Sequence, residues 1–160
     1  CIVALLAASM LSGGAGHAGQ ASLPKHRVSV LAADPFAAFV TEASRRFAVP
    51  ERWLRAVMRV ESGEKSRVKS RKGATGLMQI MPRDGIAAGF MCSGGACFAN
   101  RPNVAQLKDP EFNIKYGTRM LAGLVKKHGE YREALKAYGP MNSGYYYADK
   151  VLSIYKRYGN

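Results

Sequence analysis

Apolar residues recur at helical spacing over most of the chain that follows Asp34. The pair Asp34-Pro35 is typical of a helix start, because aspartate caps free backbone N–H groups and proline fits the first helical turn. Aromatic and aliphatic residues then return every three or four positions as far as Phe47. This pattern predicts a helix from about Pro35 to Phe47.

A second apolar stripe contains one ionisable residue. Leu54, Val57, Met58 and Glu61 follow one another at the i, i+3, i+4 and i+7 positions. This spacing places all four side chains on one face of a helix, and Gly63 is a typical helix terminator. A carboxylate therefore lies where a core residue is expected.

The rest of the chain also shows helical patterns. The apolar run near residues 76–89 predicts a helix that is bent or restarted at Pro82, whereas residues 91–106 have the composition of a loop. No run of alternating residues indicates a sizeable sheet, so the predicted fold class is mainly α with little or no β-sheet. Three later segments have helical spacing, and they are residues 110–129, 131–138 and 147–158.

The N-terminal segment has a different character. Residues 1–11 are apolar but too short to span a bilayer, and small residues follow them. We therefore expect residues 1–21 to be a truncated signal peptide, residues 22–33 to be a linker, and residues 34–160 to be one domain. The alternatives are a buried apolar strand or helix start, and a less favoured lipoprotein in which Cys1 is acylated.

Two cysteines flank a short glycine turn at Cys92 and Cys97. If the chain is exported, it meets an oxidising compartment, and this pair becomes a candidate disulfide. Free thiols are the alternative. The three histidines are scattered and no further cysteine pair exists, so the sequence predicts no metal site.

The formal net charge of +13 favours an anionic partner. The basic residues are spread along the chain without a Lys/Arg block or an aromatic-basic module, so nucleic acid is not expected. Export would favour a polymer of the cell envelope instead. The simpler interpretation is that many of these charges only solvate helix surfaces.

Glu61 is the candidate catalytic group. A glutamate at the end of an apolar stripe loses solvation, which disfavours its charged form and raises its pKa, as a general acid near neutral pH requires. The alternative is a structural carboxylate that forms an ion pair with Arg59, Lys65 or Arg55.

Most glycosidases use two carboxylates, about 5 to 10 Å apart. The chain has 11 acidic residues, and those other than Glu61 lie mostly at expected helix starts or on exposed faces. No obvious partner emerges, which favours an acid that works alone with help from its substrate.

The segment Glu61-Ser62-Gly63, followed by the stretch from Ser70 to Pro82, resembles the catalytic domain of soluble lytic transglycosylases, glycoside hydrolase family 23. Further segments are similar to later parts of that domain, and the resemblance covers about residues 36–158 in the right order. These segments are Asp109-Pro110 with Asn113-Ile114 and Gly117, then Ala137-Tyr138-Gly139, then Tyr147 to Tyr155.

The resemblance implies a lysozyme-like fold and cleavage of the β-1,4 bond between N-acetylmuramic acid and N-acetylglucosamine in peptidoglycan. In this family one glutamate is first the acid and then the base toward the muramyl 6-hydroxyl, which gives a 1,6-anhydro end without water. Glu61 takes this place by position. No cofactor is implied.

The resemblance also implies substrate-binding residues. Ser70 matches a serine that contacts the muramyl sugar, and the alternative is a loop cap. Gln79 matches a glutamine that lines the cleft, and the alternative is an amide bound to backbone. Tyr138 matches a tyrosine whose hydroxyl approaches the glutamate. Met81 and Tyr147 complete the predicted substrate-binding set.

Three further positions are expected to be structural. Ser62 is interpreted as a helix-end hydroxyl. Asn113 is interpreted as a buried residue that binds the loop behind the acid. Met78 is expected in the core.

The chain departs from the family pattern in two places. Many members read Ala-Tyr-Asn-Ala-Gly where this chain has Ala137-Tyr138-Gly139-Pro140-Met141, so the contact of that asparagine is missing or supplied elsewhere. Many members also have a glutamate at a position near Ser143. Both departures bear on substrate subsites and not on the acid.

Two other functions compete with the transglycosylase. One is a hydrolytic lysozyme with the same fold, and the other is a non-catalytic cell-wall-binding protein of a secretion machine. In each case we expect an exported monomer in the periplasm or at the cell wall, without a stable membrane anchor. Peptidoglycan is the expected partner, together with a secretion, conjugation or pilus apparatus.

Overall fold

Helices dominate residues 33–159, which are the part of the chain that the computed structural model describes. The mainly α fold class is confirmed, because the strands in these residues form one two-stranded hairpin. The expected signal peptide and the expected linker, except Ala33, lie outside the described residues. The helices are α1 (Ala37–Phe47), α2 (Glu51–Ser62), the 3₁₀ helix η1 (Gly85–Gly89), α3 (Val104–Leu107), α4 (Pro110–His128), α5 (Tyr131–Tyr138) and α6 (Tyr146–Arg157).

The helix ends follow the expected local chemistry. The Asp34 carboxylate accepts a 2.9 Å hydrogen bond from the Phe36 N–H just before α1. The Asp109 carboxylate caps α4 by accepting from the Phe112 N–H at 2.7 Å. Gly129 ends α4 with φ +80°, a left-handed conformation in which glycine carries no steric penalty.

The helix predicted near residues 76–89 is wrong. The chain folds back instead, so that Thr75 and Ile80 exchange backbone hydrogen bonds of 2.9 and 3.1 Å. Gly76 and Gln79 have φ values of +83° and +46°, which a right-handed helix excludes. Within this segment, only η1 is helical. The apolar run is buried as a turn, not as one face of a helix.

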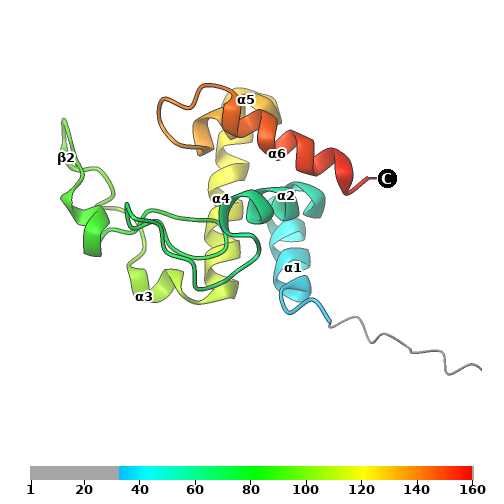
Figure 1. The fold of residues 1–160 in the computed structure, drawn as a ribbon, viewed down its shortest axis with the longest axis horizontal. Helices are drawn as coiled ribbons and strands as arrows, with labels where there is room; N and C mark the ends of the chain where they lie inside the picture. The colour runs from blue at the N-terminus through cyan, green and yellow to red at the C-terminus, as the bar shows by residue number, and fades with distance from the viewer. Residues whose placement is uncertain (1–32, 160) are drawn as a thin grey trace, which may run out of the picture. The chain divides into compact units, whose positions relative to one another are not determined.

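Helix α4 runs through the middle of the fold, and α1, α3 and α5 pack against it (Figure 1). Helix α2 packs against α1 and α6, and α5 packs against α6. Trp53 of α2 lies between two tyrosines, with ring centroids 4.3 Å from Tyr131 and 3.8 Å from Tyr155. This aromatic stack joins α2 to α5 and α6.

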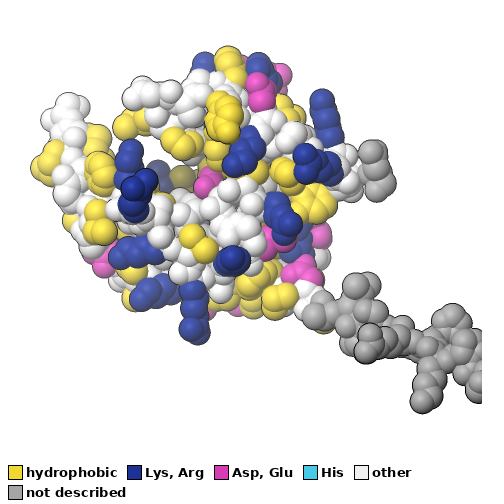
Figure 2. Space-filling view, in the orientation of Figure 1, with side chains coloured by type: hydrophobic (Ala, Val, Ile, Leu, Met, Phe, Trp, Pro, Cys, Tyr) yellow, Lys and Arg dark blue, Asp and Glu magenta, His cyan; other side chains and the backbone are white. Residues whose placement is uncertain are grey.

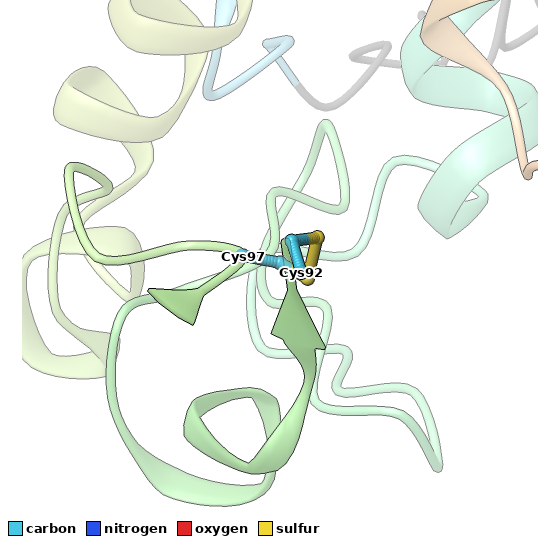
Figure 3. The surroundings of a disulfide bond; sticks show 2 residues. All are labelled: Cys92 and Cys97. Atoms are coloured by element: carbon cyan, nitrogen blue, oxygen red, sulfur yellow. A yellow bond between two sulfur atoms is a disulfide. The ribbon is translucent and has the colours of Figure 1, made fainter. Parts of the chain in front are cut away.

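The segment predicted as a loop contains a small hairpin of β1 (Met91–Cys92) and β2 (Gly95–Ala96). Cys92 and Cys97 form a disulfide with an S–S distance of 1.98 Å, and this bond closes the turn (Figure 3). The short helix α3 follows this hairpin.

None of the described helices has the length and apolar composition needed to cross a bilayer.

Candidate active site

Glu61 lies in the last turn of α2, which ends at Ser62. Gly63 follows with φ +59° and directs the chain away from the helix. The Glu61 side chain is half-buried. The hydroxyl of Tyr147, from the first turn of α6, donates a 2.5 Å hydrogen bond to Glu61 Oε1. A contact between residues 86 positions apart in the sequence therefore orients the carboxylate.

Burial raises the pKa of Glu61 from its ordinary value of 4.5 to about 7. The hydrogen bond from Tyr147 and the positive charge of Lys150 act in the opposite direction, but desolvation is the larger effect. At neutral pH the carboxyl group therefore exists in both forms. This balance suits a group that first gives and then takes a proton.

The ion-pair alternative for Glu61 does not match the geometry. Among the described residues, the ion pairs that involve nearby arginines join Arg59 to Glu64 at 3.2 Å and Arg55 to Asp34. Neither guanidinium pairs with Glu61, and within residues 33–159 no ion pair joins Lys65 to Glu61.

Tyr138 lies beside Tyr147, with nearly parallel rings and centroids 6.4 Å apart. Its hydroxyl, which was expected to approach Glu61, donates a 2.9 Å hydrogen bond to the Met78 carbonyl. Burial, and then the charge of Glu61, raise the pKa of Tyr138 well above 10, which indicates that the carboxylate is close. Tyr147 supplies the hydroxyl that binds the carboxylate, and Tyr138 holds the loop next to it.

The loop behind Glu61 is fixed by the buried side chain of Asn113 on α4. Its Oδ1 accepts from the Met78 N–H at 2.8 Å, and its Nδ2 donates to the carbonyls of Thr75 and Leu107, both at 2.9 Å. A Cβ at Gly76 would collide with the Asn113 amide, so the close approach requires glycine. One amide therefore satisfies three backbone groups of two segments.

Ser62 also holds the same loop. Its hydroxyl lies within hydrogen-bond distance of the Leu77 carbonyl at 2.8 Å and of the Met58 carbonyl at 3.1 Å. Ser62 is thus a helix-end hydroxyl, as expected, but it also joins the end of α2 to the turn at Leu77. Met78 is fully buried, as expected for a core residue.

The other predicted substrate-binding side chains lie in the same loop. The Ser70 hydroxyl accepts from the Ala74 N–H at 3.0 Å, which is the loop-cap geometry. The Gln79 amide nitrogen donates to the carbonyls of Val68 and Gly76 at 3.1 and 2.9 Å. Gln79 and Met81 both remain partly exposed.

The remaining carboxylates have other partners or lie on the surface. Glu133 accepts from the Tyr145 hydroxyl, and Asp84 accepts from the Val104 N–H. Burial, with no contribution from a second carboxylate among the described residues, raises the pKa of Glu61. The site therefore has one carboxyl group whose surroundings favour proton transfer.

The face shown in Figure 2 is hollowed between the hairpin and the α5–α6 region, with an acidic side chain inside the hollow and Lys and Arg side chains on both sides. A separate surface cavity of about 280 Å³ lies between α1 and α4 and shares no residue with the Glu61 cluster. Within residues 33–159, no group of three His, Cys, Asp or Glu side chains is placed to hold a metal ion.

The fold and this cluster define a lysozyme-like helical domain with one half-buried carboxyl group at its candidate site. The chain belongs to the Transglycosylase SLT domain family. Residues 38–154 of the chain match the sequence pattern of this family.

Named relatives agree with this assignment. The chain is 32% identical over 88 residues to the membrane-bound lytic murein transglycosylase E of Buchnera aphidicola. The aligned residues are 55% of this chain and 38% of the relative. It is 37% identical over 84 residues to the soluble lytic murein transglycosylase of Escherichia coli K12, which covers 52% of this chain and 12% of that protein. The chain thus matches less than half the length of these relatives.

Solved structures show the same fold. The 70 kDa soluble lytic transglycosylase of Escherichia coli superposes with a TM-score of 0.58 at 25% identity, which covers 78% of this chain and 25% of that protein. A structure of the same type of enzyme in complex with bulgecin A gives a TM-score of 0.57 at 26% identity, covering 79% and 25%.

Proposed function

We propose that the chain is a peptidoglycan lytic transglycosylase with Glu61 as its only acid and base. It would cleave the β-1,4 bond between N-acetylmuramic acid and N-acetylglucosamine and leave a 1,6-anhydromuramyl end. The observation that carries the proposal is a single half-buried carboxyl group that accepts a hydrogen bond from Tyr147, in a chain of the transglycosylase family.

The proposed reaction uses the two protonation states of Glu61 in turn. The protonated carboxyl group gives its proton to the glycosidic oxygen as the bond from this oxygen to the muramyl C1 breaks. The resulting carboxylate then takes the proton of the muramyl 6-hydroxyl, whose oxygen forms a new bond to C1. The proton returns to Glu61, so the cycle is balanced without water.

The surroundings of Glu61 support both steps. Partial burial raises the pKa of the carboxyl group, so that a fraction of it is protonated near neutral pH and can act as an acid. The Tyr147 hydroxyl can then stabilise the carboxylate, because a hydrogen bond to the charged form favours that form. A hydrolytic enzyme of the retaining type would need a second carboxylate about 5 Å away, and the chain offers no obvious one.

The test compares wild type with Glu61→Gln on purified cell walls. Gln keeps an acceptor for Tyr147 but cannot transfer the proton, so lysis should stop while sedimentation with the wall continues. Glu64→Gln is the matched control, because Glu64 lies three positions further along and pairs with Arg59. Unaltered lysis by Glu61→Gln would exclude Glu61 as the acid.

Mass spectrometry of the soluble products then distinguishes the two enzymatic reactions. Anhydromuramyl ends support the transglycosylase, and reducing muramyl ends would identify a hydrolytic lysozyme. Wall binding by wild type without any soluble product would identify a non-catalytic assembly protein.

We also propose that the protein acts in the cell envelope as a monomer. Relatives are named for murein, and a basic chain of net charge +13 suits a polymer that carries carboxylates. The protein would open the wall locally for a secretion, conjugation or pilus apparatus. Cell fractionation tests the location, and sedimentation equilibrium tests the monomer.

A further inference from the structure

Gly139 ends α5 directly before Pro140. Its N–H donates to the Leu135 carbonyl at 3.0 Å, and its φ and ψ angles are −67° and −178°. This extended conformation is open to any residue and is the one that a following proline favours. The backbone conformation therefore does not explain why position 139 holds glycine.

The space around Gly139 does explain it. A Cβ at this position would lie 2.5 Å from both Cγ and Cδ1 of Tyr147 and 2.8 Å from Tyr147 Cβ. Cβ and Cγ do not move when the ring rotates about the bond that joins them, so a rotation of the ring cannot remove the collision. Tyr147 is only 6% exposed and has little room to move. Relief would require a shift of α6 or of the end of α5.

Contacts of Tyr145 with α5 also oppose a shift of α6 away from α5. The Tyr145 ring, just before α6, has the Arg132 guanidinium carbon 3.9 Å and the Lys136 ammonium nitrogen 4.3 Å from its centroid. Its hydroxyl donates to Glu133 at 2.5 Å. All three partners are on α5, so these contacts hold the start of α6 against α5.

We propose that Gly139 is a positioning residue of the active site: the absence of a side chain at position 139 makes the space for the Tyr147 ring, whose hydroxyl holds the Glu61 carboxylate. The chain departs from the family pattern at this position, and an asparagine on this backbone would place its Cβ 2.5 Å from the Tyr147 ring. Gly139 thus acts on Glu61 indirectly, because only the Tyr147 side chain lies between the two residues.

The first test measures stability and does not depend on activity. Gly139→Ala should lower the unfolding midpoint, whereas the same substitution should cost less in a Tyr147→Ala background, where two of the three colliding atoms are gone. Gly123→Ala is the matched control, because a Cβ at this helical glycine meets no atom within 4 Å. An equal cost of Gly139→Ala in both backgrounds would overturn the proposal. If the single variant does not fold, recovery of folding in the double variant supports it.

The second test measures catalysis and rests on the proposed function. Gly139→Ala should slow wall cleavage on the order of 10- to 100-fold, because a small misplacement of a catalytic group has effects of this size. In a Tyr147→Phe background it should have no further effect on the rate. A full additional loss in this background would contradict an action through the Tyr147 hydroxyl.

The pH profile adds a readout that a purely structural role would not move. The groups that face Glu61 are Tyr147 and Lys150 from α6 and Tyr138 from α5. Displacing the Tyr147 hydroxyl removes an interaction that lowers the pKa of Glu61, so the alkaline limb should move to higher pH in Gly139→Ala and Tyr147→Phe alike. An unmoved limb in Gly139→Ala would overturn the proposal. If Glu61→Gln remains active, the proposed function fails, and the stability test still decides the role of Gly139.

Discussion

The half-buried carboxyl group of Glu61 should make the protein less stable as the pH rises. The folded protein holds this proton up to a pH of about 7, whereas the unfolded chain releases it near the ordinary value of 4.5. Below the pKa that Glu61 has in the unfolded chain, the protonated carboxyl group makes its full contribution to the stability of the folded protein. This contribution is lost as the pH rises through the pKa of Glu61 in the folded protein. Glu61→Gln has no proton to lose, so it should escape this effect.

The magnitude follows from the difference between the two pKa values. At 1.36 kcal/mol per pH unit, the difference gives an upper limit of about 3 kcal/mol. Because the side chain is only half-buried, solvent reduces this value, and we expect about 2 kcal/mol. Gln keeps the size of the side chain and the acceptor for Tyr147, so packing changes should contribute little.

Urea unfolding of wild type and Glu61→Gln at about pH 4.5 and about pH 8.5 measures this difference. The stability advantage of Glu61→Gln should grow by about 2 kcal/mol between the two conditions. Glu51→Gln is a suitable control, because Glu51 is exposed in the first turn of the same helix. An advantage that is the same at both pH values would refute a raised pKa of Glu61 in the folded protein.

Three further predictions concern the surroundings of this group. Tyr147→Phe should raise the pKa of Glu61 by about one unit, because a hydrogen bond to a charged group contributes at least about 1.5 kcal/mol; the alkaline limb of the cleavage rate measures it. Asn113→Ala should lower the free energy of unfolding by about 3 kcal/mol or more, because three buried backbone groups lose their partner, and chemical denaturation measures this loss. Replacing Cys92 and Cys97 by serine should cost at most about 2 kcal/mol, because the disulfide closes a short loop, and thermal unfolding with and without reductant checks it.

Local sequence signals were sufficient for most helices. The ends of α2 and α4 lie where Gly63, Asp109 and Gly129 indicate them, because caps and terminators act within one turn of the helix. The burial of Glu61 also followed from helical spacing alone. These features depend on neighbours in the sequence, which a single sequence shows directly.

Features that depend on distant contacts were not predictable in the same way. The turn at residues 76–80 has the composition of a helix, but Asn113 and Ser62 hold it in another conformation. Which tyrosine reaches Glu61 depends on how α6 packs against α2, and helical spacing does not contain this information. The sequence shows that position 139 differs from the family pattern. The consequence of this difference becomes visible only with the position of the Tyr147 ring.

The aromatic stack around Trp53 gives this protein an intrinsic optical probe. Trp53 is the only tryptophan of the chain, and its ring lies against Tyr131 of α5 and Tyr155 of α6. These two helices also supply Tyr138 and Tyr147. Tryptophan emission should therefore change when α5 and α6 dock on α2 during refolding, so stopped-flow fluorescence can follow the assembly of the active site without an attached label.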